Sequence, residues 1–151
     1  MTTINRTSQD RPIVDAALLV VRIIVGIIFM MHGAQKMFGA FGGPGLSGVV
    51  QMMGPIGYLV AIGEFFGGLG LVVGFLSRFS AASLIVIMLG AIVQVHGKNG
   101  FFLSEKGFEF NLALIGLLAP ILMAGPGRFA ASHFLPLPKV KGTGQPTPVL
   151  E

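Results

Sequence analysis

Four long apolar segments follow one another along this chain, and they limit the folds open to it more than any other feature. They cover residues 16–38, 56–76, 79–96 and 108–124. Each is close to the roughly 20 apolar helical residues that cross a hydrocarbon core of roughly 30 Å. A transmembrane barrel would instead need alternating strands of about ten residues, and these runs do not alternate. The segments therefore predict an all-α integral membrane protein.

The composition supports this class. Hydrophobic types make up 53% of the 151 residues and charged types only 11%. A soluble domain carries about 25% charged residues, and so short a chain cannot bury this much apolar surface. The net charge of +4 comes from scattered basic residues, so no basic cluster is available for a nucleic-acid backbone. The chain has no cysteine and therefore no thiolate for redox chemistry.

Short connections between the segments predict an up-down-up-down bundle of four transmembrane helices. Basic residues orient it, because cytoplasmic loops of membrane proteins are enriched in Lys and Arg. The side that holds both chain ends would carry seven basic residues and the opposite side three, so both termini are expected in the cytoplasm. The seven are Arg6, Arg11, Arg22, Arg78, Arg128, Lys139 and Lys141, and the three are Lys36, Lys98 and Lys106.

The rest of the chain divides around these spans. Residues 1–15 are expected to form a cytoplasmic N-terminal segment, and residues 16–135 the membrane domain. The tail at 136–151 is rich in Pro and is expected to be disordered. The connection at 39–55 is rich in Gly and yet apolar. It favours either a short interfacial helix around 47–53 or a re-entrant segment that lines a cavity.

Polar side chains within the apolar segments gather in one half of the predicted bundle. Such groups are costly in a membrane, so each is a candidate functional residue. Counted at about 1.5 Å of rise per residue, four helices place polar groups in the outer half, whereas the inner half holds only Arg22. The outer group consists of His32, Glu64, Gln94, His96 and Asn111. We expect a small polar pocket that opens outward.

Glu64 is the most demanding residue of this group, because its carboxyl group cannot easily reach water. It is expected to be neutral, to lie beside a hydrated cavity, or to pair with a base. The candidate bases are His32, Lys36 and Arg78. A purely structural ion pair that locks the bundle is the alternative to a role in proton or ligand handling. Lys36 and Arg78 are also expected to extend toward lipid headgroups.

A quinone headgroup fits these residues best, because it needs hydrogen-bond partners for two carbonyls, a proton carrier and an apolar groove. Glu64 would handle protons and His32 would donate a hydrogen bond. Gln94 or His96 would orient the ring; the two lie about 200° apart, so both face the bundle centre only where the helix is irregular. The candidate cofactor-binding residues are His32, Lys36, Glu64, Arg78, Gln94, His96 and Asn111.

Two other cofactors stay open as alternatives. A haem b could take His32 and His96 as axial ligands. A metal site is less favoured, because no HxxxH or HxxE spacing occurs on one helix, and no metal is assigned. Nucleotide and nucleophile motifs do not occur either.

A glycine stripe marks the second apolar segment. Gly63, Gly67, Gly70 and Gly74 lie on one face of a helix there, and such a stripe lets another backbone approach closely. Helix packing commonly produces this pattern. A homo-oligomer formed through the four glycines is the alternative.

Four motifs in order carry a family resemblance, over roughly residues 14–133. They are HGAQKMFG from His32, GEFFGGLGLVVGFLSRFSA from Gly63, VHGKNGFF from Val95 and GPGRFA from Gly125. Together they resemble the DoxX family. The resemblance implies a small four-helix protein of the bacterial inner membrane. The positions that match its polar motif residues are His32, Lys36, Glu64, Arg78 and His96.

The resemblance also implies a function. Some relatives are associated with quinone-linked oxidation, and others anchor oxidoreductase complexes, so other oxidoreductase subunits are the implied partners. We therefore interpret the chain as a redox-associated, quinone-linked membrane subunit, and whether it is an enzyme by itself stays open. The rival hypotheses are a non-catalytic scaffold or anchor for a partner complex and a small-solute transporter.

Overall fold

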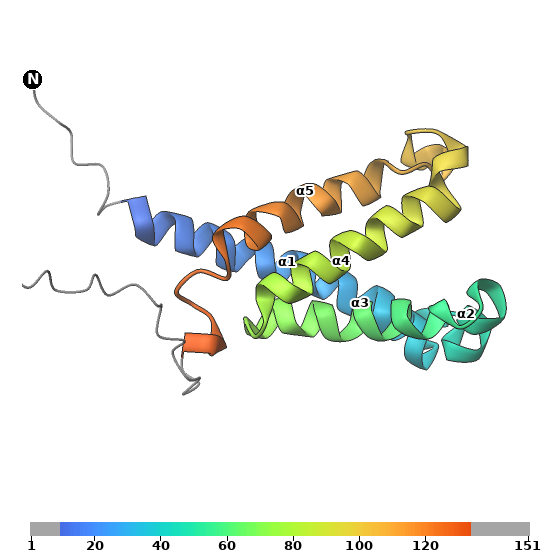
Figure 1. Cartoon of the computed structure of the whole chain (residues 1–151), viewed down its shortest axis with the longest axis horizontal. Helices are drawn as coiled ribbons and strands as arrows, with labels where there is room; N and C mark the ends of the chain where they lie inside the picture. Colours follow the sequence, from blue (N-terminus) through green and yellow to red (C-terminus); the bar gives the residue numbers. More distant parts are fainter. Residues whose placement is uncertain (1–9, 134–151) are drawn as a thin grey trace, which may run out of the picture.

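Four long helices run along the molecule (Figure 1). The structure, a computed structural model, describes residues 10–133, and this part contains helices and no strands. The all-α prediction is confirmed for these residues. Successive long helices alternate in direction in Figure 1, as a bundle with short connections should. They are α1 (Asp10–Phe38), α3 (Ile56–Val73), α4 (Ser77–Ala91) and α5 (Glu109–Ala124).

Three of the helical stretches are long and apolar enough to cross a membrane: Pro12–Phe38, Ile56–Val73 and Ser77–Asn99. The fourth, α5, is apolar but has only 16 residues, or about 24 Å of rise. The four predicted spans therefore appear as three full-length helices and one shorter helix. The side of the membrane on which each end lies stays a prediction.

The predicted N-terminal segment can be compared with the structure, whereas the predicted tail cannot. α1 begins at Asp10, so residues 10–15, expected to belong to a separate N-terminal segment, are part of the first long helix. A proline in the first turn does not prevent this, because its missing N–H would have no helical partner there. The tail predicted to be disordered, residues 136–151, lies outside the described residues.

The connections carry short helices of their own. In the glycine-rich connection α2 (Gly45–Met53) forms, beginning two residues before the predicted interfacial helix; its position relative to the membrane stays a prediction. At the other connection α4 continues into a π-helical segment, Ile92–His96. Two 3₁₀ turns, Gly97–Asn99 and Leu103–Glu105, then lead to α5.

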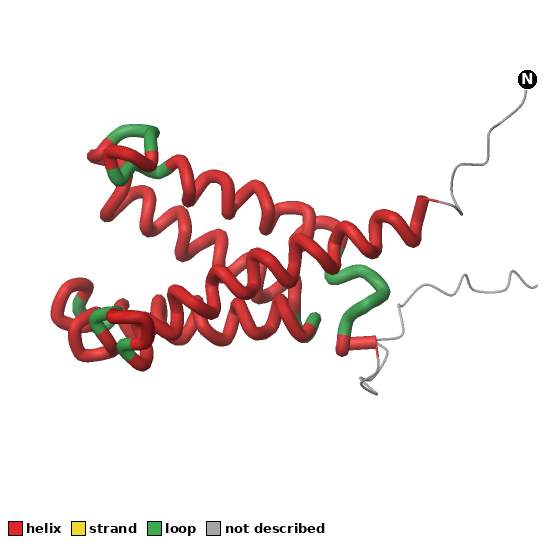
Figure 2. The backbone as a smooth tube through the Cα atoms, turned by 180° about the vertical axis from the view of Figure 1, so that it is seen from behind, coloured by secondary structure: helices red, strands yellow, loops and turns green. Residues whose placement is uncertain are grey.

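The helices pack as two pairs that diverge. α1 packs chiefly on α3, whereas α4 packs on α5 and, almost as extensively, on α3. The pairs lie together at the end that holds the α3–α4 turn and separate toward the end that holds α2 and the α4–α5 connection, as Figure 2 shows from behind. The buried side chains between them form one apolar core: Val25, Phe29, Leu71, Ala81, Leu84, Met88, Leu114, Leu118 and Ile121.

Glycines allow α1 and α3 to approach closely. A Cβ atom at Gly68 of α3 would lie 2.6 Å from the carbonyl oxygen of Gly26 and 2.7 Å from the amide nitrogen of Met30. A Cβ atom at Gly33 of α1 would overlap the backbone of Phe65. Backbone atoms cannot move aside as side chains do, so the contact between α1 and α3 depends on these positions having no side chain.

The predicted glycine stripe of α3 lies against other parts of the same chain. A Cβ atom at Gly63, Gly67 or Gly70 would meet a side chain of α4, and one at Gly74 would meet Ala130 and the guanidinium of Arg22. The stripe is therefore used for packing within the chain, and the homo-oligomer stays a prediction. The α4 side chains that face the first three glycines are, in order, Ile87, Leu84 and Ser80.

Arg22 fastens the segment after α5 to α1. Its side chain is only 1% exposed. Its Nη1 donates to the carbonyl oxygen of Pro126 at 2.7 Å, and its Nη2 donates to that of Phe129, also at 2.7 Å. Asp15 adds a second link, because its Oδ1 accepts a hydrogen bond from the amide of Arg128 at 3.1 Å. The buried guanidinium of Arg22 thus satisfies two backbone carbonyls of the GPGRFA motif.

We expect Gly68→Ala to destabilise the bundle by about 1–3 kcal/mol, because the added methyl group meets backbone atoms of α1. Thermal unfolding in detergent, followed by circular dichroism at 222 nm, measures the loss. Gly116→Ala is the matched control, because a Cβ atom there meets nothing within 4 Å. Equal melting temperatures for both variants would contradict the close approach of α1 and α3.

We expect Arg22→Met to release the segment that follows α5, because two partly buried carbonyls lose their donors, at a cost of about 1 kcal/mol each. Hydrogen–deuterium exchange at the amides of Arg128 and Ser132 should become faster. Arg78→Met is the comparison, because the bond of Arg78 to Met123 is exposed and should matter less. Unchanged protection in Arg22→Met would rule out this anchoring role.

Candidate functional site

A cavity of about 620 Å³ opens at the end where the helix pairs diverge, and α1, α3, α4, α5 and the α4–α5 connection all contribute to its wall. Most of the wall is apolar, with Phe29, Leu59, Met88 and Phe110 among its residues. Six of the seven candidate cofactor-binding residues also line it: His32, Lys36, Glu64, Gln94, His96 and Asn111.

Glu64 and Lys36 form an ion pair on the wall of this cavity. Glu64 lies on α3 and is 4% exposed, and Lys36 lies in the last turn of α1. The Nζ atom of Lys36 donates to Oε2 of Glu64 at 2.5 Å. Of the three candidate bases, the structure therefore pairs Glu64 with Lys36. Lys36 thus supplies the cation that a buried carboxylate needs, and its extension toward lipid headgroups stays a prediction.

His32 lies one turn before Lys36 on α1. Residues four apart project from the same face of a helix, so both side chains reach the cavity. The ring of His32 is exposed and tilted at 58° to that of Phe110, with 6.5 Å between the ring centroids. The imidazole is therefore accessible on the cavity wall, next to an aromatic face of α5.

Gln94 and His96 both line the cavity, although a regular helix would separate them by about 200°. The α4 helix is not regular here, because residues Ile92–His96 form a π-helical segment. Such segments are rare and occur often at functional sites. The π-helical segment is therefore the irregularity that allows Gln94 and His96 to face the interior together.

His96 has a fixed ring orientation. Its Nδ1 lies 2.8 Å from the carbonyl oxygen of Lys106, and since a carbonyl can only accept, Nδ1 is the donor. In the neutral ring Nε2 is then the acceptor. Asn99 donates to the same carbonyl from Nδ2 at 3.2 Å. The connection after α4 is therefore tied to the histidine at the rim of the cavity.

Asn111 contributes to the wall from within the packed core. It is 7% exposed, and its Nδ2 donates to Sδ of Met88 at 3.4 Å. A thioether is a weak acceptor, so this amide is only weakly satisfied by the contact.

Arg78 does not belong to this group, which corrects the predicted set. It lies at the start of α4, 16 residues before Gln94, or about 24 Å along a helix. Its Nη2 donates to the carbonyl oxygen of Met123 at 3.2 Å. Arg78 therefore links α4 to the end of α5, far from the cavity. Arg78 lies at the end of the predicted bundle opposite to His32, and this position in the sequence could have excluded it from the predicted site.

Sequence reasoning also missed the aromatic and loop residues of the wall. Phe110 of α5 and Leu103 and Gly107 of the connection line the cavity beside the polar group. Only tertiary packing brings them there. The His32–Lys36 spacing of four residues, by contrast, was available in the sequence as a sign that both side chains share one face.

The arrangement offers a defined chemistry. One side of the cavity carries a carboxylate paired with an ammonium group, and the imidazole of His32 and the amide of Gln94 supply further hydrogen-bonding groups. The remaining wall is apolar. A cavity of this size and character is typical of sites for small organic molecules, which use few polar groups to fix orientation.

The family model for DoxX matches residues 17–97, more than half of the chain. A Bacillus subtilis (strain 168) protein named "Putative oxidoreductase CatD" is 30% identical over 109 residues, which are 68% of this chain and 76% of that protein. The Escherichia coli (strain K12) protein "Inner membrane protein YqjF" is 29% identical over 124 residues, or 80% and 93% of the two chains. No solved structure matches the chain. The chain belongs to the DoxX family of membrane proteins.

Proposed function

We propose that the cavity beside Glu64 and Lys36 binds the headgroup of a membrane quinone, and that the protein is a redox-associated subunit of the bacterial cytoplasmic membrane. The observation that carries the proposal is the buried ion pair on the wall of an otherwise apolar cavity. A purely structural pair has no need of a cavity at its side. The names of the two relatives, "Putative oxidoreductase CatD" and "Inner membrane protein YqjF", support the same class.

The residues present fit such a headgroup. A quinone ring with two carbonyl oxygens requires donors on the wall and apolar surface for its ring. Lys36 and His32 supply donors from α1, and the amide of Gln94 supplies another from α4. Phe29 and Phe110 supply apolar surface. The cavity volume of about 620 Å³ lies within the range of roughly 300–1,000 Å³ that small-molecule sites occupy.

The proposed roles follow from position and chemistry. A bound quinone supplies two-electron redox chemistry that takes up two protons. Glu64 handles these protons, because it is the carboxyl group at the cavity wall and Lys36 keeps a proton donor within 2.5 Å of it. His32 donates a hydrogen bond, and Gln94 or His96 orients the ring. With no cysteine in the chain, electrons come from a partner subunit.

A scaffold is the second candidate, because the same ion pair joins α1 to α3. In that role Glu64 and Lys36 only lock two helices, and the family member serves as an anchor for a partner complex. The two hypotheses make different demands on the cavity. A scaffold tolerates a change in its wall, whereas a binding site does not.

We expect Lys36→Met to destabilise the protein strongly, because it leaves the carboxylate of Glu64 buried without a cation. The loss should stay below the roughly 3–5 kcal/mol typical of fully buried pairs, since the Lys36 side chain is 24% exposed. The double variant Lys36→Met/Glu64→Gln should recover most of it. Thermal unfolding of the two single variants and the double variant measures the coupling; additive losses would show that the pair contributes no interaction.

We expect a quinone to be extracted by organic solvent from detergent-purified protein, at about one molecule per chain. His32→Phe and Gln94→Leu should each weaken the affinity for quinone about tenfold, because the loss of one hydrogen bond costs roughly 1.4 kcal/mol. Glu105→Gln is the control, because Glu105 is exposed on the connection and does not line the cavity. Chromatography with mass spectrometry quantifies the quinone.

The same preparations separate the rival hypotheses. Absence of quinone from the wild-type protein, purified with its membrane partners, would overturn the proposal. A visible absorption band lost in His32→Phe and His96→Ala would favour haem b instead. Glu64→Gln should retain quinone and lose quinone reduction in membranes; loss of partner assembly with unchanged quinone reduction would favour the scaffold.

A further inference from the structure

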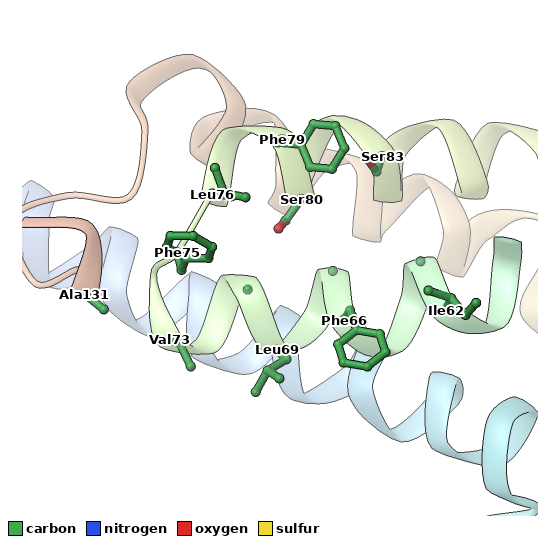
Figure 3. Close-up of a pocket in the computed structure, with 13 residues that line it drawn as sticks. Ile62, Phe66, Leu69, Val73, Phe75, Leu76, Phe79, Ser80, Ser83 and Ala131 are labelled. Carbon is green, nitrogen blue, oxygen red and sulfur yellow. The ribbon is translucent and has the colours of Figure 1, made fainter. Parts of the chain in front are cut away.

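A second cavity, of about 790 Å³, forms a groove between α3 and α4. Phe66 of α3 and Phe79 of α4 line it, and Figure 3 shows the glycine-rich face of α3 along it, with the hydroxyl of Ser80 directed into the space. Phe75 and Ala131 lie at one end of the groove and Ile62 at the other (Figure 3). Apart from the hydroxyl groups of Ser80 and Ser83, the side chains that line it are apolar.

The groove and the Glu64 cavity meet on α3. Ile62 and Gly63 line the groove, and the next residue, Glu64, lines the cavity. On α4 the meeting point is Ile87, which lines the cavity, and whose Cδ1 would lie 2.7 Å from a Cβ atom at Gly63. The tip of this flexible side chain therefore packs against Gly63 at the boundary between the two spaces.

The linings of the two spaces together match the polarity of one amphipathic ligand. Ionisable side chains line the cavity, and none lines the groove. The groove follows α3 from Gly63 to Val73, ten residues, or about 15 Å of helix. α3 and α4 also diverge toward the end that holds the cavity (Figure 1).

We infer that the groove between α3 and α4 binds the isoprenoid tail of the quinone whose headgroup occupies the Glu64 cavity, with Gly63 and Ile87 at the passage between them. This inference rests on the proposed function and narrows its ligand to a quinone with a long hydrocarbon tail. A tail that leaves lipid for the groove gains packing contacts rather than the free energy of leaving water, and the polar cavity supplies orientation.

The test compares two ubiquinone analogues that share one ring, one without a tail and one with a ten-carbon tail. Their dissociation constants are measured for the wild-type protein and for Gly63→Val, which fills the passage, and Ser83→Leu, which fills the groove away from the cavity. Gly116→Val is the control, because its Cβ atom meets nothing within 4 Å. Ratios between variants cancel the partitioning of each analogue into detergent.

We expect Gly63→Val and Ser83→Leu to weaken binding of the tailed analogue at least tenfold and to leave the tailless analogue unchanged. Ser83→Leu decides the matter if Gly63→Val fails to fold. Equal effects on both analogues, or none on either, would overturn the inference and leave the proposed function standing. Failure of both analogues to bind the wild-type protein would overturn the inference and the proposed function together. Loss of a co-purified phospholipid alone would assign the groove to lipid.

Discussion

A carboxylate inside a bundle of apolar helices needs a partner, and in this protein the ion pair of Glu64 with Lys36 supplies it. The pair joins the two helices that pack most closely, α1 and α3. Its position near one end of the bundle also places polar groups where the helix pairs separate. Desolvating two charges costs several kcal/mol, which a short, direct contact offsets.

At the opposite end of the bundle, the buried charge is satisfied by backbone groups instead of an ion pair. Arg22 has carbonyl oxygens as its acceptors, and these belong to the segment that follows α5. The guanidinium group has several donors in a fixed plane, so one side chain can hold two backbone positions at once. One end of the bundle is thereby closed by backbone contacts, while the other is held apart around a cavity.

Polarity is distributed between the two spaces of the molecule in a way that bears on function. The cavity beside Glu64 carries charged and amide groups, and the groove between α3 and α4 is apolar. In a bilayer, a purely apolar surface favours lipid and offers no orientation. The proposed recognition of a specific ligand therefore depends on the polar cavity.

The class of protein and the polar residues that line the cavity could be predicted from the sequence. Long apolar runs in so short a chain require a membrane, and a polar residue within such a run is costly unless it has a partner or a role. The sequence predicted the long helices to within a few residues, except at the start of α1. It also selected six of the residues that line the cavity.

Only the tertiary structure decided which of these residues meet. Lys36 rather than His32 or Arg78 pairs with Glu64, and Arg78 lies at the far end of α4. The π-helical segment at Ile92–His96, which lets Gln94 and His96 share one wall, has no signature in the hydrophobic pattern. The physical reason is that apolar periodicity reports the faces that helices bury, whereas pairing and helix irregularity depend on distances between helices that only packing sets.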